Sequence, residues 1–161
     1  MLIRKAELSD IAFIEELLIR GCEERHFGPT VKIQAKAMLE QVIKYGSLEF
    51  MLLRNNRKSV CTKKVEIFVA VLNGETASFI INALYENEAE LHLAYTHKNF
   101  RRKGLFLNLL MYSVERYEKD MKINRIYARC YNKSSWAKEC LLKNGFSVSQ
   151  YGNPEELQLD T

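Results

Sequence analysis

The chain has 161 residues, of which 47% are hydrophobic and 27% charged, a composition typical of a soluble globular protein with a single domain over residues 1–161. The formal net charge of +4 is too small for a dedicated nucleic-acid-binding protein. No apolar run approaches the roughly 20 residues of a membrane span, and the first residues lack a signal-peptide pattern, so we expect a cytoplasmic protein without membrane or nucleic-acid partners.

Four cysteines are spread along the chain without a C-x-x-C pair and without clustered histidines. They are Cys22, Cys61, Cys130 and Cys140. This spacing predicts neither a zinc site nor a disulfide framework. We therefore expect reduced thiols that pack as small hydrophobic residues, and no metal site.

A strand and a helix are expected at the start of the chain. Residues 2–6 have extended character. Apolar side chains then recur at helical spacing from Ile11 to Leu18. Ser9 precedes this run as a candidate N-cap and Gly21 follows it as a candidate stop, so the helix is expected between them.

The next segment predicts a second helix, a short strand and a loop. Apolar residues at helical spacing cover residues 31–45, and residues 47–54 have strand character. Residues 55–64 carry several cations and few apolar residues, which indicates a solvated loop. A binding patch for nucleic acid or an acidic partner is the alternative interpretation, but no aromatic side chains are interleaved with the cations.

Three consecutive antiparallel strands are expected in the middle of the chain. Residues 65–72 and 76–84 are rich in β-branched and aromatic residues. The Asn73-Gly74 pair between them is the strongest short hairpin signal that a sequence offers. A further turn then leads into a third strand over residues 90–96.

The third strand leads into a basic turn. Leu91, Leu93 and Tyr95 alternate with smaller or polar residues, so we expect them to share one face. The period then changes, and apolar residues over 103–119 follow one face of a helix. The turn between the two consists of Arg101, Arg102, Lys103 and Gly104. A strand that passes through such a turn into a helix presents free N–H groups beside cations, which predicts a site for phosphate or pyrophosphate.

The remaining residues predict a strand, a helix and a strand. The first strand covers residues 123–131, and Ser134 or Ser135 caps a helix that Gly145 ends. The last strand covers residues 146–151, and a short terminal segment follows it. The resulting order β-α-α-β-β-β-α-β-α-β is a mixed α/β sandwich, with helices on both faces of a largely antiparallel sheet.

The basic turn resembles the Gln/Arg-x-x-Gly-x-Gly/Ala signature of the GNAT superfamily of acyl-CoA-dependent N-acyltransferases. Arg101 takes its first position, Gly104 its fourth and Phe106 its sixth, where the family usually has glycine or alanine. The predicted order of elements is also the one by which the GNAT fold is known. The resemblance therefore covers nearly the whole chain, and it implies this fold and an acetyl-CoA-dependent activity.

The resemblance implies that acetyl-CoA binds as a cosubstrate along the third strand and the basic turn. Backbone N–H groups of the turn would hold the pyrophosphate, the basic side chains would screen its charge, and the main chain of the strand would pair with the pantetheine arm. The expected cofactor-binding residues are Ala94, Tyr95, Thr96, Arg101, Arg102, Lys103, Gly104, Leu105, Phe106, Asn132 and Ser134.

Two residues of the third strand are candidates for the general base. Glu90 lies eleven residues before Arg101, where some GNAT proteins, notably histone-type acetyltransferases, carry a glutamate base. His92 would project from the same face, since strand side chains repeat every second residue. An ordered water relay in place of a direct base is the third alternative.

The general acid is where the sequence departs most from the family. Many members carry a tyrosine before the final Gly-Phe that protonates the CoA thiolate, and Leu141 stands at that position here. Tyr131, at the end of a predicted strand, is the candidate substitute. Cys130 beside it has no adjacent histidine or cation that would lower its pKa, so we interpret it as a core residue.

Taken with the resemblance, these residues predict an acetyl-CoA-dependent N-acetyltransferase that acts on a primary amine by direct attack within a ternary complex. The acceptor would be a small molecule or a protein, and the enzyme a monomer or a homodimer. The missing tyrosine and Phe106 leave a non-catalytic acyl-CoA-binding or interaction module on the same fold as an alternative. Binding of a nucleotide or RNA through the basic turn is disfavoured, because no known nucleic-acid motif is present.

Overall fold

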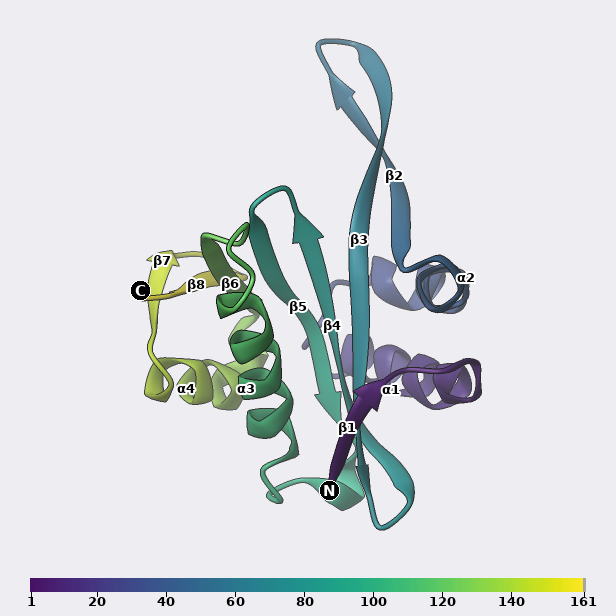
Figure 1. Cartoon of the computed structure of the whole chain (residues 1–161), viewed down its shortest axis with the longest axis vertical. Coiled ribbons are helices and arrows are strands. Elements are labelled where there is room, and N and C mark those ends of the chain that lie inside the picture. Colours follow the sequence, from purple (N-terminus) through teal and green to yellow (C-terminus); the bar gives the residue numbers. More distant parts are fainter. Residues whose placement is uncertain (161) are drawn as a thin grey trace.

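The computed structural model describes residues 1–160, and the side chains of all of them except residues 50–54. An eight-stranded twisted sheet lies between two layers of helices (Figure 1). The strands are β1 (Leu2–Lys5), β2 (Ser47–Arg54), β3 (Arg57–Leu72), β4 (Glu75–Tyr85), β5 (Glu88–Thr96), β6 (Arg125–Cys130), β7 (Phe146–Gln150) and β8 (Glu155–Leu159). The helices are α1 (Ile11–Glu23), α2 (Thr30–Tyr45), α3 (Leu105–Glu118) and α4 (Ser135–Lys143), with short 3-10 turns at Leu8–Asp10, Lys98–Phe100 and Asn132–Ser134.

The sheet has the order β1-β3-β4-β5-β6-β8-β7, and β2 pairs with the first half of β3. Neighbouring strands are antiparallel except β5 and β6, which are parallel. Helices α1 and α2 cover one face and α3 and α4 the other, so each side of the sheet has its own hydrophobic core (Figure 1). The predicted mixed α/β fold is confirmed; the short strand expected over residues 47–54 forms as β2, and β8 is added to the predicted order. Within residues 1–160, no helix is long and apolar enough to cross a membrane.

Strand β3 begins at Arg57, so the expected loop over residues 55–64 is wrong. Asn55 and Asn56 turn the chain with φ values of 49° and 59°, a left-handed conformation that asparagine adopts more readily than most residues. Strands β2 and β3 form a hairpin that projects beyond the body of the molecule (Figure 1). The first half of β3 is exposed to solvent, which explains its polar side chains. It nevertheless pairs regularly with β2.

The terminal segment forms strand β8, which the sequence analysis missed. It pairs with both β6 and β7, and so inserts between them in the sheet. Leu157 and Leu159 pack into the core under α3 and α4. Glu156 forms ion pairs with Arg125 and Arg129 of β6, so β8 is joined to its neighbour by side chains as well as by main-chain pairing.

Strand β5 contains a bulge at His92. The ladder with β4 pairs Leu91 with Asn82 and resumes at Leu93, so His92 is an extra residue in β5. The bulge shifts the alternation of side chains: Leu91 packs under α3 and α4, whereas Leu93 and Tyr95 pack under α1 and α2. The expectation that these three apolar residues share one face is wrong for this reason.

Helix α1 begins and ends differently from the sequence prediction. Asp10, and not Ser9, closes the turn before the helix, because its carboxylate accepts hydrogen bonds from the Glu7 backbone N–H at 2.8 Å and from Arg4 at 2.7 Å. The helix also continues through Gly21 and ends two residues later. The glycine is therefore inside the helix and needs another explanation.

Gly21 is needed because the Phe27 ring occupies the space of a side chain there. We expect Gly21→Ala to lower the free energy of unfolding by about 1–3 kcal/mol, since overpacking outweighs the roughly 1 kcal/mol by which helices prefer alanine to glycine. Urea unfolding measures the change. In a Phe27→Ala background the same substitution should be neutral or stabilising, and an equal loss in both backgrounds would contradict the predicted clash.

A buried carboxylate joins α3 to β3. Glu66, only 3% exposed, accepts hydrogen bonds from the Arg116 guanidinium at 2.9 and 2.8 Å and from the Tyr117 hydroxyl at 2.9 Å. Lys5 and Lys64 lie within 3.9 and 3.8 Å of the same carboxylate. Burial by itself would raise the pKa of Glu66, but the hydrogen bonds from Arg116 and Tyr117 hold that pKa below its usual range, so the carboxylate is ionised.

Candidate active site

The two parallel strands diverge in the middle of the sheet. Pairing of β5 with β6 ends at Leu91, opposite Ala128. From His92 to Thr96, no strand in the described part of the chain pairs with the edge of β5 that faces β6. Main-chain groups at such an edge can pair with an extended ligand as they would with an added strand. Two cavities lie beside this edge.

The first cavity, of about 310 Å³, ends at the turn between β5 and α3. Arg102 and Gly104 have positive φ values of 64° and 73°, and Gly104 is the N-cap from which α3 starts at Leu105. Helix geometry leaves the N–H groups of Leu105, Phe106 and Leu107 without an acceptor inside the helix. These N–H groups and the positive end of the helix dipole favour an anion at this end of the cavity.

A second cavity, of about 450 Å³, adjoins the first. Residues that line both cavities mark the junction between them, and they are His26, Phe27, Ala94, Phe106, Ser134 and Ala137. Ile80, Leu110 and Leu141 line the second cavity from the core under α3 and α4. Glu90 and His92 contribute polar groups to it. An extended molecule can therefore run from the α3 turn through the junction to these polar groups.

The first cavity brings together most of the predicted cofactor-binding residues. It is lined by Ala94, Tyr95, Thr96, Arg101, Arg102, Gly104, Leu105, Phe106 and Ser134. Lys103 and Asn132, both in the described part of the chain, line neither cavity. The ammonium group of Lys103 lies 5.4 Å from the centroid of the Phe100 ring, and the Asn132 backbone N–H donates to Asn153 Oδ1 at 3.0 Å.

The two candidate bases form a hydrogen-bonded pair. His92 Nδ1 lies 3.0 Å from Glu90 Oε1, and the Arg129 guanidinium and the Tyr127 hydroxyl each donate to the same carboxylate at 3.4 Å. Glu90 is 6% exposed, whereas the His92 side chain is 45% exposed. Burial by itself would raise the pKa of Glu90, but the hydrogen bond and charge of His92, with the charge of Arg129, lower that pKa. Glu90 is therefore an ionised carboxylate that orients the imidazole.

The candidate acid and its neighbours line the second cavity. Tyr131 is half-buried just after β6, and its hydroxyl lies next to Gly28 in the loop between α1 and α2. Leu141 is 2% exposed and has no proton to donate. Burial raises the pKa of Cys130 to about 11, so its thiol stays protonated at neutral pH, as a core residue would.

A hydrogen-bond network links the end of α1 to the first cavity. Glu24 Oε2 accepts a hydrogen bond from the Tyr95 hydroxyl at 2.6 Å and lies 3.3 Å from both the Arg101 guanidinium and His26 Nε2. His26 Nδ1 lies 2.9 Å from Ser134 Oγ, and Ser134 makes no side-chain cap on α4. The network thus joins the loop after α1, β5, the α3 turn and the start of α4.

The network also sets the charge states of its members. Burial, reinforced by the hydrogen bond to Glu24, raises the pKa of Tyr95 to about 12. Burial lowers the pKa of His26, and the charge of Arg101 adds to this effect against the opposing charge of Glu24. Glu24 and His26 lie in a stretch without hydrophobic periodicity, so the sequence did not indicate them as site residues. No group of three His, Cys, Asp or Glu side chains within residues 1–160 is arranged to hold a metal ion.

Several solved structures resemble this fold over nearly its whole length. The PaiA N-acetyltransferase from Thermoplasma acidophilum, in complex with coenzyme A, has a TM-score of 0.72 at 16% identity, covering 99% of this chain and 98% of that one. An aminoglycoside acetyltransferase in complex with coenzyme A and kanamycin has a TM-score of 0.69 at 15% identity, covering 99% and 94%. The ribosomal-protein-S18-alanine N-acetyltransferase from Escherichia coli has a TM-score of 0.64 at 15% identity, covering 98% and 92%. Identities this low show a shared fold alone.

No curated protein matches the sequence. A profile of the acetyltransferase (GNAT) family matches residues 35–146, which is more than half of the chain. The match includes β5, the α3 turn and α4, which contribute many of the residues that line the two cavities. The basic turn and the order of elements had predicted the same family. This chain therefore belongs to the GNAT family of acetyltransferases.

Proposed function

We propose that the protein is an acetyl-CoA-dependent N-acetyltransferase that acetylates a primary amine by direct attack within a ternary complex. One observation carries the proposal: two connected cavities lie beside the open edge of β5. One ends at the N–H groups and cations of the α3 turn, and the other holds the Glu90–His92 pair. This arrangement suits an elongated cosubstrate with an anionic end and an amine that approaches its other end. When bound, acetyl-CoA supplies the acetyl group as a thioester.

The α3 turn would hold the pyrophosphate of the cosubstrate. The backbone N–H groups of Leu105 and Phe106 are available at the helix N-terminus, and Arg102 adds a cation in the same cavity. The side chain of Phe106, where the family usually has glycine or alanine, packs against Trp136 and the core under α3 and α4. The main chain from Ala94 to the end of β5 would pair with the pantetheine arm.

His92 would accept the proton of the attacking amine, with Glu90 as the residue that positions it. The lowered pKa of Glu90 makes this carboxylate a weak base. Its hydrogen bond to Nδ1 favours the tautomer in which Nε2 of His92 carries the free lone pair. As the amine nitrogen bonds to the acetyl carbon and the carbon–sulfur bond breaks, Tyr131 would return a proton to the thiolate.

A non-catalytic acyl-CoA-binding module is the second candidate, because the buried Leu141 cannot donate a proton. Turnover distinguishes the two candidates. Thiol release from acetyl-CoA should be followed with a panel of small amines and peptides, and reactions without acceptor correct for the four cysteines of the protein. Amine-dependent thiol release supports the enzyme, whereas tight acetyl-CoA binding without it supports the module.

Acetyl-CoA at about 100 times its dissociation constant is expected to raise the free energy of unfolding by about 2.7 kcal/mol, because it binds the folded state and not the unfolded chain. Thermal unfolding with and without acetyl-CoA measures this effect. The absence of a shift with both acetyl-CoA and CoA would rule out the enzyme and the binding module together.

The same measurement on Arg102→Ala tests the position of the pyrophosphate. Loss of one cation beside the phosphates is expected to weaken CoA binding roughly tenfold, which corresponds to about 1.4 kcal/mol. The unliganded variant should keep its stability, because Arg102 is exposed. Lys119→Ala, at the other end of α3, is the matched control. Arg101 is a less direct probe, since its guanidinium also bonds to Tyr95 at 2.7 Å.

A further inference from the structure

Two aromatic rings meet where α3 and α4 begin. Phe106 and Trp136 are each the second residue of their helix, and their ring centroids are 5.4 Å apart at an interplanar angle of 57°. Phe106 packs against the core under the two helices, whereas Trp136 is 61% exposed. A large ring that is supported on one side and open on the other can receive a second flat ring.

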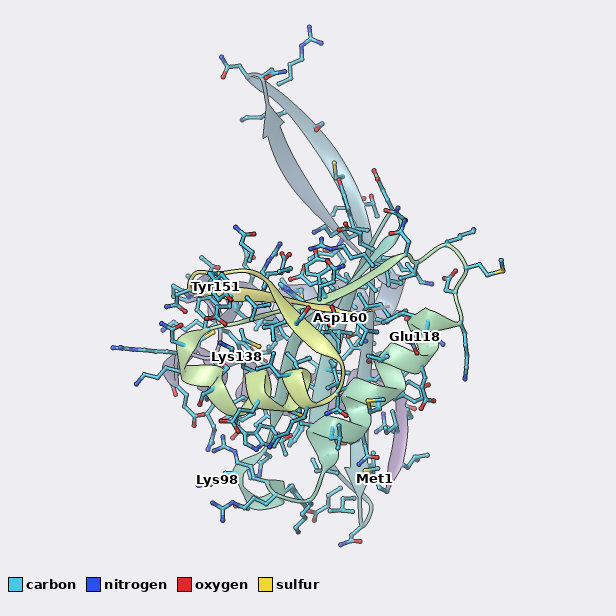
Figure 2. The ribbon with its side chains drawn as sticks, turned by 90° about the vertical axis from the view of Figure 1, so that its left-hand side faces the viewer. Met1, Lys98, Glu118, Lys138, Tyr151 and Asp160 are labelled. Atoms are coloured by element: carbon cyan, nitrogen blue, oxygen red, sulfur yellow. The ribbon has the colours of Figure 1, made fainter. Side chains whose placement is uncertain are left out.

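Trp136 lines the outer part of the first cavity. The inner part is the junction with the second cavity, which includes Ala94 and Ser134. Arg102, Lys133 and Trp136 line the first cavity only, so they lie away from that junction. Figure 2 shows α4, marked by Lys138, beside α3, with the loop of Lys98 that precedes the α3 turn below them.

The two ends of a CoA molecule can be assigned to these two parts, an assignment that rests on the proposed function. With the pyrophosphate at the N–H groups of Leu105 and Phe106, the pantetheine arm runs inward along β5 toward His92. The adenosine 3′-phosphate is attached on the other side of the pyrophosphate, and so stays in the outer part. Its adenine is a flat heteroaromatic ring, and its phosphate is an anion, which suits an exposed indole beside a lysine.

We propose that Trp136 stacks on the adenine ring of CoA and that Lys133 binds the 3′-phosphate. Lys133 is exposed and lines the same cavity, three residues before Trp136. The other aromatic rings of the outer part are already engaged. Tyr95 is buried with its hydroxyl in hydrogen bonds, and the Lys103 ammonium lies over the Phe100 ring. Trp136 is therefore the ring with an accessible face.

Intrinsic fluorescence tests the stacking directly, because Trp136 is the single tryptophan of the sequence. CoA should quench its emission as adenine stacks on the indole. The compound 4′-phosphopantetheine lacks the adenosine, and should bind without quenching. Calorimetry on the same samples gives the affinity of each compound independently of the fluorescence signal.

Variants of the protein separate the contribution of the adenine to CoA affinity from that of the rest of the molecule. Trp136→Ala should weaken CoA binding about tenfold and leave the affinity for 4′-phosphopantetheine unchanged, and Trp136→Phe should restore most of the loss. Lys133→Ala should weaken CoA and not dephospho-CoA, which lacks the 3′-phosphate. Leu142→Ala, on the same helix and 43% exposed, lies outside both cavities and should change neither affinity.

The outcomes are distinguishable. If CoA binds with unchanged Trp136 emission, or if Trp136→Ala weakens CoA and 4′-phosphopantetheine equally, the adenine contact is overturned while CoA binding stands. Equal weakening of CoA and dephospho-CoA by Lys133→Ala would overturn the phosphate contact. If calorimetry detects no CoA binding by the wild type, the proposed function itself fails, and the adenine site fails with it.

Discussion

The His92→Ala variant is expected to acetylate amines about 10²- to 10⁴-fold more slowly than the wild type at saturating substrate, with unchanged affinity for acetyl-CoA. Its imidazole is half-exposed in the second cavity and hydrogen-bonded to Glu90, the arrangement of a base held by an orienting carboxylate. His92 belongs to neither hydrophobic core, so its removal should leave the fold intact. Steady-state kinetics and calorimetry together separate the chemical step from binding.

Matched variants distinguish the base from the residue that orients it. Glu90→Gln keeps a polar side chain of the same size without the charge, and is expected to lose activity by a smaller factor. His97→Ala, a histidine outside both cavities, should keep the wild-type kcat. Wild-type kinetics in His92→Ala would exclude this base and favour a water relay.

Glu66→Ala is expected to lower the free energy of unfolding by about 3 kcal/mol, near the lower end of the range for a broken buried ion pair. The buried Tyr117 hydroxyl would lose its acceptor, whereas the Arg116 side chain, 41% exposed, can turn toward solvent. Thermal unfolding should show a decrease of about 6–12 °C for a chain of this size. Glu75→Ala, an exposed carboxylate on the neighbouring strand β4, should change stability by less than about 0.5 kcal/mol.

The acid dependence of stability gives an independent test of the same carboxylate. The pKa of Glu66 is lower in the folded protein than its ordinary value of 4.5. Its stabilising contribution is therefore complete at neutral pH and is lost as the pH falls below 4.5 toward the lowered pKa. Glu66→Gln should lose less stability than the wild type between about pH 5 and pH 3. Parallel curves for the two proteins would show that Glu66 is not ionised as its contacts require.

Local turn chemistry made the main strands and the α3 turn predictable. Asn73 and Gly74 have φ values of 53° and 82°, as a two-residue hairpin turn requires, and they join β3 to β4 where expected. Gly104 likewise has a conformation that few residues other than glycine adopt, and it starts α3. Each of these signals is contained in a few consecutive residues, so neighbours in the fold were not needed to interpret them.

Elements that depend on distant partners were not predictable in the same way. The first half of β3 carries polar side chains and no hydrophobic stripe, because it pairs with β2 away from the core. Strand β8 is short, and it pairs with β6 on one side and β7 on the other. Its Leu157 and Leu159 could be recognised as core residues only once that position in the sheet was known. The first error arose because hydrophobic alternation reports burial, and the start of β3 is paired without being buried on one face. The second arose because β8 has only five residues, too few for a clear alternation.

The residues of the candidate site also differ in how far they could be predicted from the sequence. The turn residues and the Glu90–His92 pair lie within one stretch of sequence, and their chemistry was visible there. Glu24 and His26 reach the site from the end of α1, and they meet Tyr95 only through the tertiary fold. Neither Glu24 nor His26 belongs to a recognisable motif in the sequence. Their part in the hydrogen-bond network could therefore not be inferred from it.

His92 is the extra residue of the β5 bulge, and neither hydrophobic core depends on it. Leu91 and Leu93 pack on opposite sides of the sheet, as two consecutive residues of a regular strand would. A shorter strand without His92 would thus satisfy both cores and keep the same pairs with β4. The fold does not require a residue at this position, and His92 is inserted where the pairing of β5 with β6 ends. Because packing makes no demand on this position, its side chain is free to serve the chemistry at the open edge.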